Sequence, residues 1–181
     1  LFSLTTNGFR GEAISSISSV AKIKISSSTN NDGLRNVLFI ENGEITKSAQ
    51  EGGLKGTTIS VSSLFYNVPA RRKFLKSDSV ELRHIISEFT KQSLCSPNLS
   101  FSFKHNNKDL FVLAKSKLME RIGRLFSKNI DQKLVPINEK TDIASISGYV
   151  FKPEFLKKTN PLQFFFVNGR YIRNGYLSHS I

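Results

Sequence analysis

The sequence predicts an α+β fold built from antiparallel strands. Alternating apolar and polar residues on both sides of Asn42-Gly43 indicate a hairpin, because this pair is favoured in type I′ turns. Two more hairpins are indicated around Asn106-Asn107 and at Asn168-Gly169. Stretches with apolar residues three and four positions apart lie between these hairpins and indicate helices. Helices mixed with hairpins are typical of the α+β class.

A glycine-containing loop leads into the first predicted helix. Gly8 and Gly11 permit backbone angles that other residues avoid, and Glu12 is expected in the first turn, where the helix dipole favours a negative charge. The apolar stripe consists of Ala13, Ile14, Ile17 and Val20. The serines are expected on the other face: Ser15, Ser16, Ser18 and Ser19. Such a loop either offers backbone N–H groups to a phosphate or caps an ordinary helix.

The next elements are a strand over Lys22–Ser27, the first hairpin, and a strand from about Thr57 to Leu64. Residues 67–77 predict a short helix with Asn67 as its cap and Pro69 in its first turn. A longer helix is predicted over residues 79–95. Its expected apolar face is Val80, Leu82, Ile85, Ile86, Phe89 and Leu94.

Ser96-Pro97-Asn98 breaks the pattern and predicts a domain boundary, which gives domains over residues 1–95 and 96–181. In the second domain, the Asn106-Asn107 hairpin precedes a helix over residues 116–126. Leu118, Ile122 and Leu125 lie on one side of that helix. A strand over residues 142–151 follows, then the last hairpin and a terminal helix that begins near Tyr176.

The composition favours a basic protein with its own core. The net charge is +12, from 26 Lys and Arg against 14 Asp and Glu, which suits a polyanionic partner such as nucleic acid. The alternative explanation for the positive net charge is a drift of the composition toward lysine and asparagine, without a binding surface. No apolar run is long enough for a membrane span, and no secretion signal is present. The single Cys95 excludes an internal disulfide, and no Cys/His cluster has metal-ligand spacing.

Three blocks of sequence resemble one family. "GFRGEAISSISSV" (8–20) resembles the motif that closes the ATP lid in the GHKL ATPases. "GTTISVSSLFYNVPARRKFLKS" (56–77) is similar to a signature of the MutL family of DNA mismatch repair proteins, and "FFFVNGRYIRN" (164–174) resembles a hairpin of its second domain. The resemblance implies the C-terminal part of a GHKL-type ATPase α/β sandwich, followed by a transducer domain of the ribosomal-protein-like left-handed βαβ type. "LFYNVPARRKFL" argues against a gyrase B or a heat-shock chaperone, which lack this block.

The resemblance also implies an activity. Members of the family are slow ATPases that act as switches: ATP with magnesium brings two protomers together around DNA, which is bound without sequence specificity. The implied partners are a second copy or a MutL-type relative, and a mismatch-recognition protein of the MutS type. No interaction with a membrane is implied. The implied location is the bacterial cytoplasm at the nucleoid, or the nucleus in a eukaryote. The alternative is a DNA-binding or protein-interaction module without nucleotide function.

The resemblance assigns roles to residues at the start of the chain. It implies that the backbone of Gly8, Phe9, Arg10 and Gly11 wraps the triphosphate and that Glu12 pins the loop or the start of the helix. Thr57 lies near the adenine in the wider GHKL group, or is a plain strand threonine. The chain is expected to begin inside the ATPase domain. No catalytic residue and no metal ligand is therefore expected within it, and the chain alone is expected to be inactive.

A second set of residues is expected to contact DNA phosphates. It consists of Arg71, Arg72, Lys73, Lys76, Arg170 and Arg173. The arginine fork suits phosphate better than the point charge of lysine. The chain has Gly175 where many relatives carry a further arginine, which thins the basic strip. The three histidines, His84, His105 and His179, lack a nucleophile or carboxylate partner at suggestive spacing and are expected to be structural or surface residues.

Overall fold

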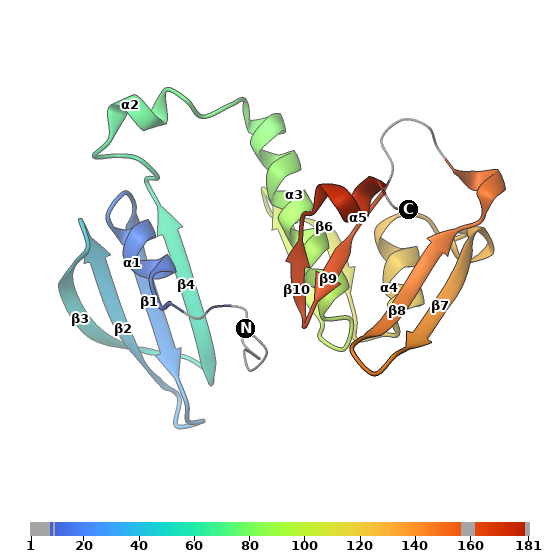
Figure 1. The fold of residues 1–181 in the computed structure, drawn as a ribbon. Helices are drawn as coiled ribbons and strands as arrows, with labels where there is room; N and C mark the ends of the chain where they lie inside the picture. Colours follow the sequence, from blue (N-terminus) through green and yellow to red (C-terminus); the bar gives the residue numbers. More distant parts are fainter. Residues whose placement is uncertain (1–7, 9, 157–161, 180–181) are drawn as a thin grey trace. The chain divides into compact units, whose positions relative to one another are not determined.

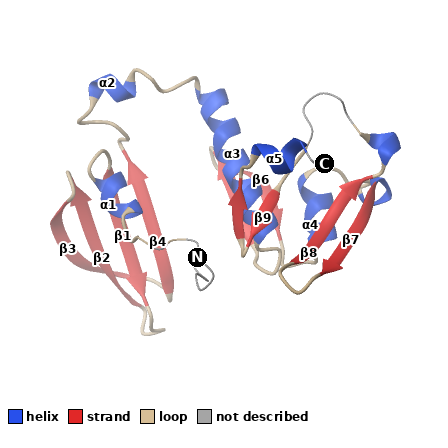
Figure 2. Cartoon of the chain, in the orientation of Figure 1, coloured by secondary structure: helices blue, strands red, loops and turns tan. Residues whose placement is uncertain are grey.

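The structure is a computed structural model that describes residue 8 and residues 10–156 and 162–179. It divides into two compact units, an N-terminal unit over Gly8–Glu81 and a C-terminal unit from Leu82 onward (Figure 1). Each unit is described by itself. The assignment of residues 1–95 and 96–181 to two domains stays a prediction. The α+β class is confirmed, because both units combine helices with antiparallel strands (Figure 2).

The N-terminal unit is a four-stranded antiparallel sheet with the order β3-β2-β1-β4. Its strands are β1 (Lys22–Ser28), β2 (Leu34–Glu41), β3 (Glu44–Gly52) and β4 (Gly56–Ser62). Its helices are α1 (Ala13–Ser18), which precedes β1, and the short α2 (Pro69–Arg72), which follows β4. The core of this unit centres on Ala21, Ile23 and Val37.

In its described residues, the C-terminal unit consists of three two-stranded hairpins with helices before, between and after them. Helix α3 (Asp78–Cys95) spans the division between the units. The hairpins are β5 (Phe101–His105) with β6 (Lys108–Leu113), β7 (Leu134–Lys140) with β8 (Ser145–Phe151), and β9 (Phe165–Val167) with β10 (Arg170–Ile172). The remaining helices are α4 (Leu118–Leu125), α5 (Gly175–His179) and two 3-10 helices, Asp131–Lys133 and Pro153–Phe155.

All three predicted hairpin turns are confirmed. Both residues of each turn have positive φ: 52° and 79° at Asn42-Gly43, 48° and 62° at Asn106-Asn107, and 48° and 75° at Asn168-Gly169. Asparagine and glycine tolerate this left-handed region at low cost. Local chemistry alone therefore set the positions of these turns.

The predicted faces of two helices are partly wrong. Ile14 and Ile17 of α1 are exposed, whereas Ser18 is buried. The polar groups of Ser18 are satisfied, because its hydroxyl donates to the carbonyl of Ser15 (2.8 Å) and its own carbonyl accepts from the N–H of Gly43 (3.0 Å). Ile85 of α3 is 53% exposed, although it was expected on the apolar face. Phe89 does pack as expected, with its ring centroid 5.2–6.0 Å from those of three aromatic residues. These are Phe101, Phe103 and Phe111.

Strand β7 was missed, and two other boundaries shift. Pro136 and the charged residues of "LVPINEK" conceal β7, because proline is depleted in strands and is confined to edges. Strand β8 begins at Ser145, three residues later than expected. Helix α2 ends at Arg72, well before the expected residue 77, although Pro69 lies in its first turn as predicted.

Arg121 is the largest fully buried side chain among the described residues. Its Nη2 donates to three backbone carbonyls, those of Pro97 (3.0 Å), Leu99 (2.6 Å) and Ala114 (3.0 Å). The guanidinium also lies 5.3 Å from the ring centroid of Phe101. Burial lowers the pKa of Arg121, with a further contribution from the charge of Arg124. Arg121 therefore fastens α4 to the start and end of the β5–β6 hairpin.

Arg35 has a similar role in the N-terminal sheet. Its Nη2 donates to the carbonyls of Ser26 (2.6 Å) and Gly56 (3.1 Å) and to the hydroxyl of Thr58 (3.1 Å), so one side chain joins β2, β1 and β4. The stem of Arg35 lies directly against Gly53, where an added Cβ would overlap Arg35 Cδ.

Gly53→Ala is therefore expected to lower the free energy of unfolding by about 1–3 kcal/mol, since overpacking moves a side chain held by three hydrogen bonds. Urea denaturation of the full chain measures it. Gly52→Ala is the matched control, because a Cβ there meets only the Gly33 carbonyl oxygen at 3.9 Å. Equal denaturation midpoints for the two variants would show that the stem of Arg35 is free to move.

Candidate nucleotide loop and nucleic-acid interface

The candidate nucleotide loop lies directly before α1. Gly8, Arg10, Gly11 and Glu12 are exposed, and Phe9 lies outside the described residues. Gly11 has φ +69°, and an added Cβ there would meet nothing within 4 Å. The backbone at Gly11 is therefore uncovered and takes a conformation that glycine adopts without strain.

Glu12 lies at the N-cap position of α1, so its expected place in the first helical turn is wrong. Its carbonyl accepts the first helical hydrogen bond, from Ser16 N–H (2.9 Å), but its side chain makes no capping hydrogen bond. The carboxylate lies 3.8 Å from Nη1 of Arg10, and both side chains are more than half exposed. Solvent screens such a pair, so it contributes little to the order of the loop.

Thr57 lies on β4 opposite Ser27 of β1, and the two hydroxyl oxygens are 2.7 Å apart. The side chain is exposed. This hydrogen bond across the strands satisfies the expectation of a plain strand threonine. A role near adenine stays a prediction for Thr57.

The C-terminal end of α1 is held by a set of polar contacts that we call the α1 junction, made of residues 18–20, 42–43 and 65–67. The carbonyls of Ser18, Ser19 and Val20 accept hydrogen bonds from Gly43 N–H (3.0 Å), Asn67 Nδ2 (2.8 Å) and Phe65 N–H (2.7 Å), in that order. The end of a helix leaves carbonyls without partners inside the helix. In α1 the turn between β2 and β3 and the segment before α2 supply those partners.

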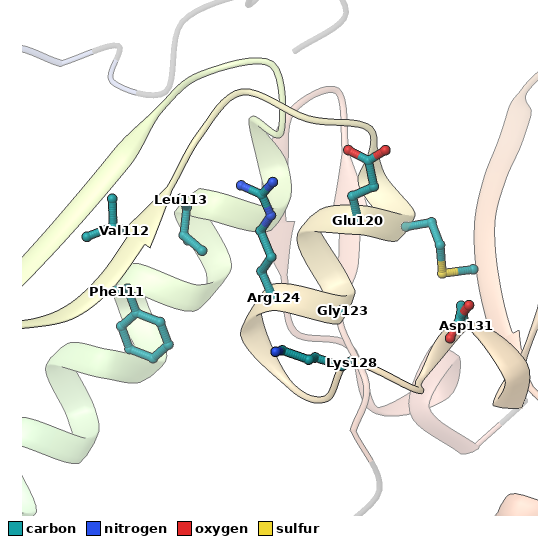
Figure 3. Close-up of a pocket in the computed structure, with 9 residues that line it drawn as sticks. Phe111, Val112, Leu113, Glu120, Gly123, Arg124, Lys128 and Asp131 are labelled. Atoms are coloured by element: carbon teal, nitrogen blue, oxygen red, sulfur yellow. The ribbon is translucent and has the colours of Figure 1, made fainter.

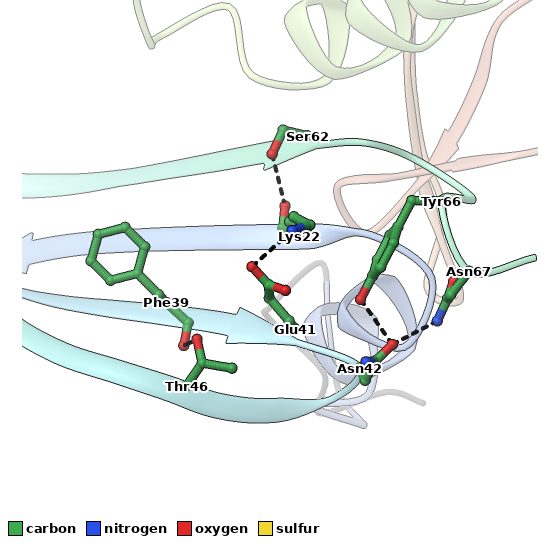
Figure 4. A network of polar contacts seen from close by, with 8 residues as sticks. All are labelled: Lys22, Phe39, Glu41, Asn42, Thr46, Ser62, Tyr66 and Asn67. Atoms are coloured by element: carbon green, nitrogen blue, oxygen red, sulfur yellow. Dashed lines mark hydrogen bonds and ion pairs between the residues drawn. The ribbon is translucent and has the colours of Figure 1, made fainter.

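Asn67 was expected to cap α2, and this is wrong. The N-cap position is Val68, and the structure has no side-chain capping hydrogen bond there. Asn67 Nδ2 instead donates to the Ser19 carbonyl and to Oδ1 of Asn42 (2.9 Å), an atom that also accepts from the hydroxyl of Tyr66 (2.8 Å; Figure 4). These long-range hydrogen bonds use the amide nitrogen as a donor, whereas a cap would use Oδ1 as an acceptor.

Figure 4 also shows what lies beside the α1 junction on the sheet. Lys22 of β1 forms an ion pair with Glu41 of β2 (3.1 Å), and its ammonium lies 5.4 Å from the centroid of the Tyr66 ring. Through Tyr66, the α1 junction therefore contacts the central strands β1 and β2.

The basic segment consists of Arg71, Arg72, Lys73 and Lys76, all with exposed side chains. The two arginines end α2, Lys73 follows at its C-cap position, and the N–H of Lys76 donates to Oε1 of Glu81 (2.9 Å). Within the described residues, none of these four side chains forms an ion pair. Their charges remain available to a phosphate, which is what a backbone-contacting surface needs.

The C-terminal unit carries the other two predicted bases at the β9–β10 hairpin. Arg170 begins β10 and is half-buried, and Arg173 follows the strand and is exposed. The hairpin is fixed to α3, because the thiol of Cys95 donates to the Gly169 carbonyl (2.6 Å) and the Lys91 ammonium lies 4.7 Å from the Tyr171 ring centroid. Burial raises the pKa of the Cys95 thiol.

An open pocket of about 520 Å³ lies between β6 and α4 in the C-terminal unit (Figure 3). It contains none of the predicted site residues. Its lining includes the apolar side chains of Phe111 and Leu113 from β6, together with two bases and two acids. The charged residues are Glu120, Arg124, Lys128 and Asp131. This balance of charge favours neither an anionic nor a cationic ligand.

Other classes of site find no support in the described part of the chain. No group of three or more His, Cys, Asp or Glu side chains is close enough there to hold a metal ion. No described helix has the length and apolar character needed to cross a membrane.

Sequence reasoning missed two residues that organise these regions. Arg121 lies three residues after Leu118 and four before Leu125, so its place on the predicted apolar face of α4 was the available signal. Asn42 was identified only as a turn residue, although its side chain joins Tyr66 and Asn67. No local pattern indicates that contact, because its partners lie 24 and 25 positions away.

Comparison with known proteins gives consistent results. Residues 122–181 match the family model described as DNA mismatch repair protein, C-terminal domain. Over all 181 residues, the chain is 49% identical to the DNA mismatch repair protein MutL of Christiangramia forsetii and 48% identical to that of Flavobacterium psychrophilum. It spans 29% and 30% of the lengths of these two relatives.

Two solved structures share the fold. The Aquifex aeolicus MutL ATPase domain complexed with ADP is 26% identical, with a TM-score of 0.77 over 97% of this chain and 71% of that chain. The N-terminal domain of a DNA repair protein is 24% identical, with a TM-score of 0.80 over 96% of this chain and 58% of that chain. These likenesses confirm the expected GHKL-type α+β fold with a transducer-like part.

Proposed function

This chain belongs to the MutL family of DNA mismatch repair proteins, and we propose that it is part of an ATP-dependent switch that binds DNA without reading its sequence. The observation that carries the proposal is the likeness of nearly the whole chain to an ATPase domain that was complexed with ADP. In this proposal the nucleotide shifts a conformational equilibrium, and its hydrolysis by the intact protein resets the switch.

The nucleotide part of the proposal assigns the triphosphate to the loop at Gly8–Glu12. Support comes from the exposed backbone at Gly11 and from its left-handed conformation, which lets N–H groups point away from the chain. Thr57 is proposed near the adenine. Magnesium binding and catalysis are assigned to the intact protein, because the described residues hold no cluster of metal ligands.

The DNA part of the proposal assigns phosphate contacts to the basic segment and to Arg170 and Arg173. Support comes from the net charge of +12 and from the exposure of the basic segment. The further partners we propose are a second copy or a MutL-type relative, and a mismatch-recognition protein of the MutS type. We propose a location in the bacterial cytoplasm, at the nucleoid, which is supported by DNA as the partner and by the bacterial relatives.

Gly11→Ala tests the nucleotide part. Alanine in the left-handed region costs about 1–2 kcal/mol, so ATP affinity is expected to fall by about five- to thirtyfold as the loop leaves this conformation. The measurement is the Kd for ATP with magnesium, by calorimetry on the full product of the gene. Gly33→Ala is the matched control, because Gly33 has φ +79°, has equally open surroundings and lies in the turn between β1 and β2.

An unchanged Kd in Gly11→Ala would contradict the assignment of the triphosphate to this loop. Absence of ATP binding by the unaltered protein would leave the second candidate function, a DNA-binding or protein-interaction module without a nucleotide. The exposed basic segment supports this module as well as it supports the ATP-dependent switch. Nucleotide binding is therefore the measurement that separates the two functions.

A further inference from the structure

We propose that Asn67 is a positioning residue that couples the nucleotide loop to the basic segment. It holds the C-terminal end of α1 against the segment that leads into α2, so a displacement of α1 is passed on to Arg71 and Arg72. The inference rests on the proposed function, because it requires a nucleotide at one end of this path and DNA at the other.

The first step of the path is α1 itself. This helix has six residues and is therefore about 9 Å long, with the candidate nucleotide loop at its N-terminal end. The hydrogen bond from Ser16 N–H to the Glu12 carbonyl joins the loop to the helix (2.9 Å). A change in the backbone of the loop therefore moves a short rigid element.

The second step is the α1 junction. Three successive carbonyls at the end of α1 are occupied by donors from elsewhere in the unit, and two of these donors, Phe65 N–H and Asn67 Nδ2, belong to the segment before α2. Asn67 is the side chain from the segment before α2 that donates to this end of α1. Its second hydrogen bond, to Asn42 Oδ1, fixes the amide in that orientation.

The third step runs from Asn67 to the basic segment. Only Val68 separates Asn67 from Pro69, the first residue of α2, and Arg72 N–H donates to the Val68 carbonyl (3.2 Å). Phe65 has φ +60°, a value that a residue with a bulky side chain rarely adopts, so the surrounding contacts hold the chain in a defined bend. A defined bend transmits a displacement that a flexible linker would absorb.

Asn67 is exposed, which separates a coupling role from a role in the core. Its replacement opens no cavity. Asn67→Asp is isosteric and removes both donors, since Nδ2 is the atom that bonds to Ser19 and to Asn42. Tyr66→Phe is a neutral second variant, which removes the other donor to Asn42. Asn36→Asp is the matched control, because Asn36 lies on β2 and its Oδ1, which accepts from Gln50, is kept by aspartate.

The experiment measures the Kd for a mixed-sequence DNA duplex at fixed salt, with and without a saturating non-hydrolysable ATP analogue. It uses the full product of the gene. The ratio of the two Kd values is the coupling factor, expected at about 5- to 150-fold in the unaltered protein. Asn67→Asp is expected to reduce it below about twofold, Tyr66→Phe to lower it partly, and Asn36→Asp to preserve it. Tyr66→Phe adds no charge, so it separates loss of contacts in the α1 junction from an effect of the aspartate charge.

The possible outcomes distinguish a failure of the inference about Asn67 from a failure of the proposed function. A coupling factor that survives in Asn67→Asp, or a factor of one in an unaltered protein that binds both ligands, overturns the inference and leaves the proposed function in place. Failure of the unaltered protein to bind the analogue or DNA overturns the proposed function itself. If Asn67→Asp does not fold, Tyr66→Phe supplies the test.

Discussion

Reversal of Arg71 and Arg72 to glutamate is expected to weaken binding of duplex DNA by on the order of 100-fold at low salt and to flatten its salt dependence. Each phosphate contact that is lost lowers the slope of log K against log salt by about 0.9, so the double variant should lose about two units of slope. The structure motivates this choice, because both side chains are exposed and neither forms an ion pair within the described residues.

The matched control reverses Lys47 and Lys55, which are exposed in the same unit and lie outside the basic segment. The change in net charge is identical, so a general effect of charge would appear in both variants. Titrations of a labelled duplex at several salt concentrations measure both slopes. A slope for the Arg71 and Arg72 variant that equals the control's would remove the basic segment from the DNA interface.

Arg121→Met is expected to lower the free energy of unfolding by about 1–3 kcal/mol. Methionine has a similar length but no donor, so the carbonyls of Pro97, Leu99 and Ala114 lose a charged partner within the fold. A hydrogen bond from a charged donor contributes more to stability than one between neutral groups. Urea denaturation measures the loss.

Arg124→Met is the control for Arg121→Met, because Arg124 lies on the same helix and is exposed. Its effect is expected to stay within about 0.5 kcal/mol, as for most surface substitutions. Similar losses in both variants would show that helix propensity, and not the three carbonyls, explains the effect at Arg121.

Local chemistry explains which parts of this fold were predictable. The turns at Asn42-Gly43 and Asn168-Gly169 depend on the two turn residues themselves, so their positions follow from the sequence. Strand β7 conflicts with its own composition at Pro136 and forms through its pairing with β8. Pairing partners are remote in sequence, and propensity does not encode them.

In the candidate site, too, local features were predictable from the sequence, whereas contacts between remote residues were not. The basic segment and Gly11 were identified from sequence, and the structure describes them as exposed. The orientation of Asn67 was missed, because an asparagine before Pro69 favours a local cap, and the Ser19 carbonyl to which its amide nitrogen donates lies 48 positions away. Ser18 and Arg121 were missed for a related reason, since burial of a polar side chain depends on partners that only the folded chain supplies.

The strand order β3-β2-β1-β4 has a consequence for the folding kinetics of the N-terminal unit. The pairings β1–β2 and β2–β3 each close a short connection, whereas the pairing β1–β4 encloses the whole β2–β3 hairpin. Loop-closure entropy rises with the length of the enclosed chain, so the three-stranded meander is the lower-cost nucleus and β4 adds to a preformed edge. Until β4 arrives, β1 presents an open row of backbone donors and acceptors, which makes this intermediate the species most exposed to association between chains.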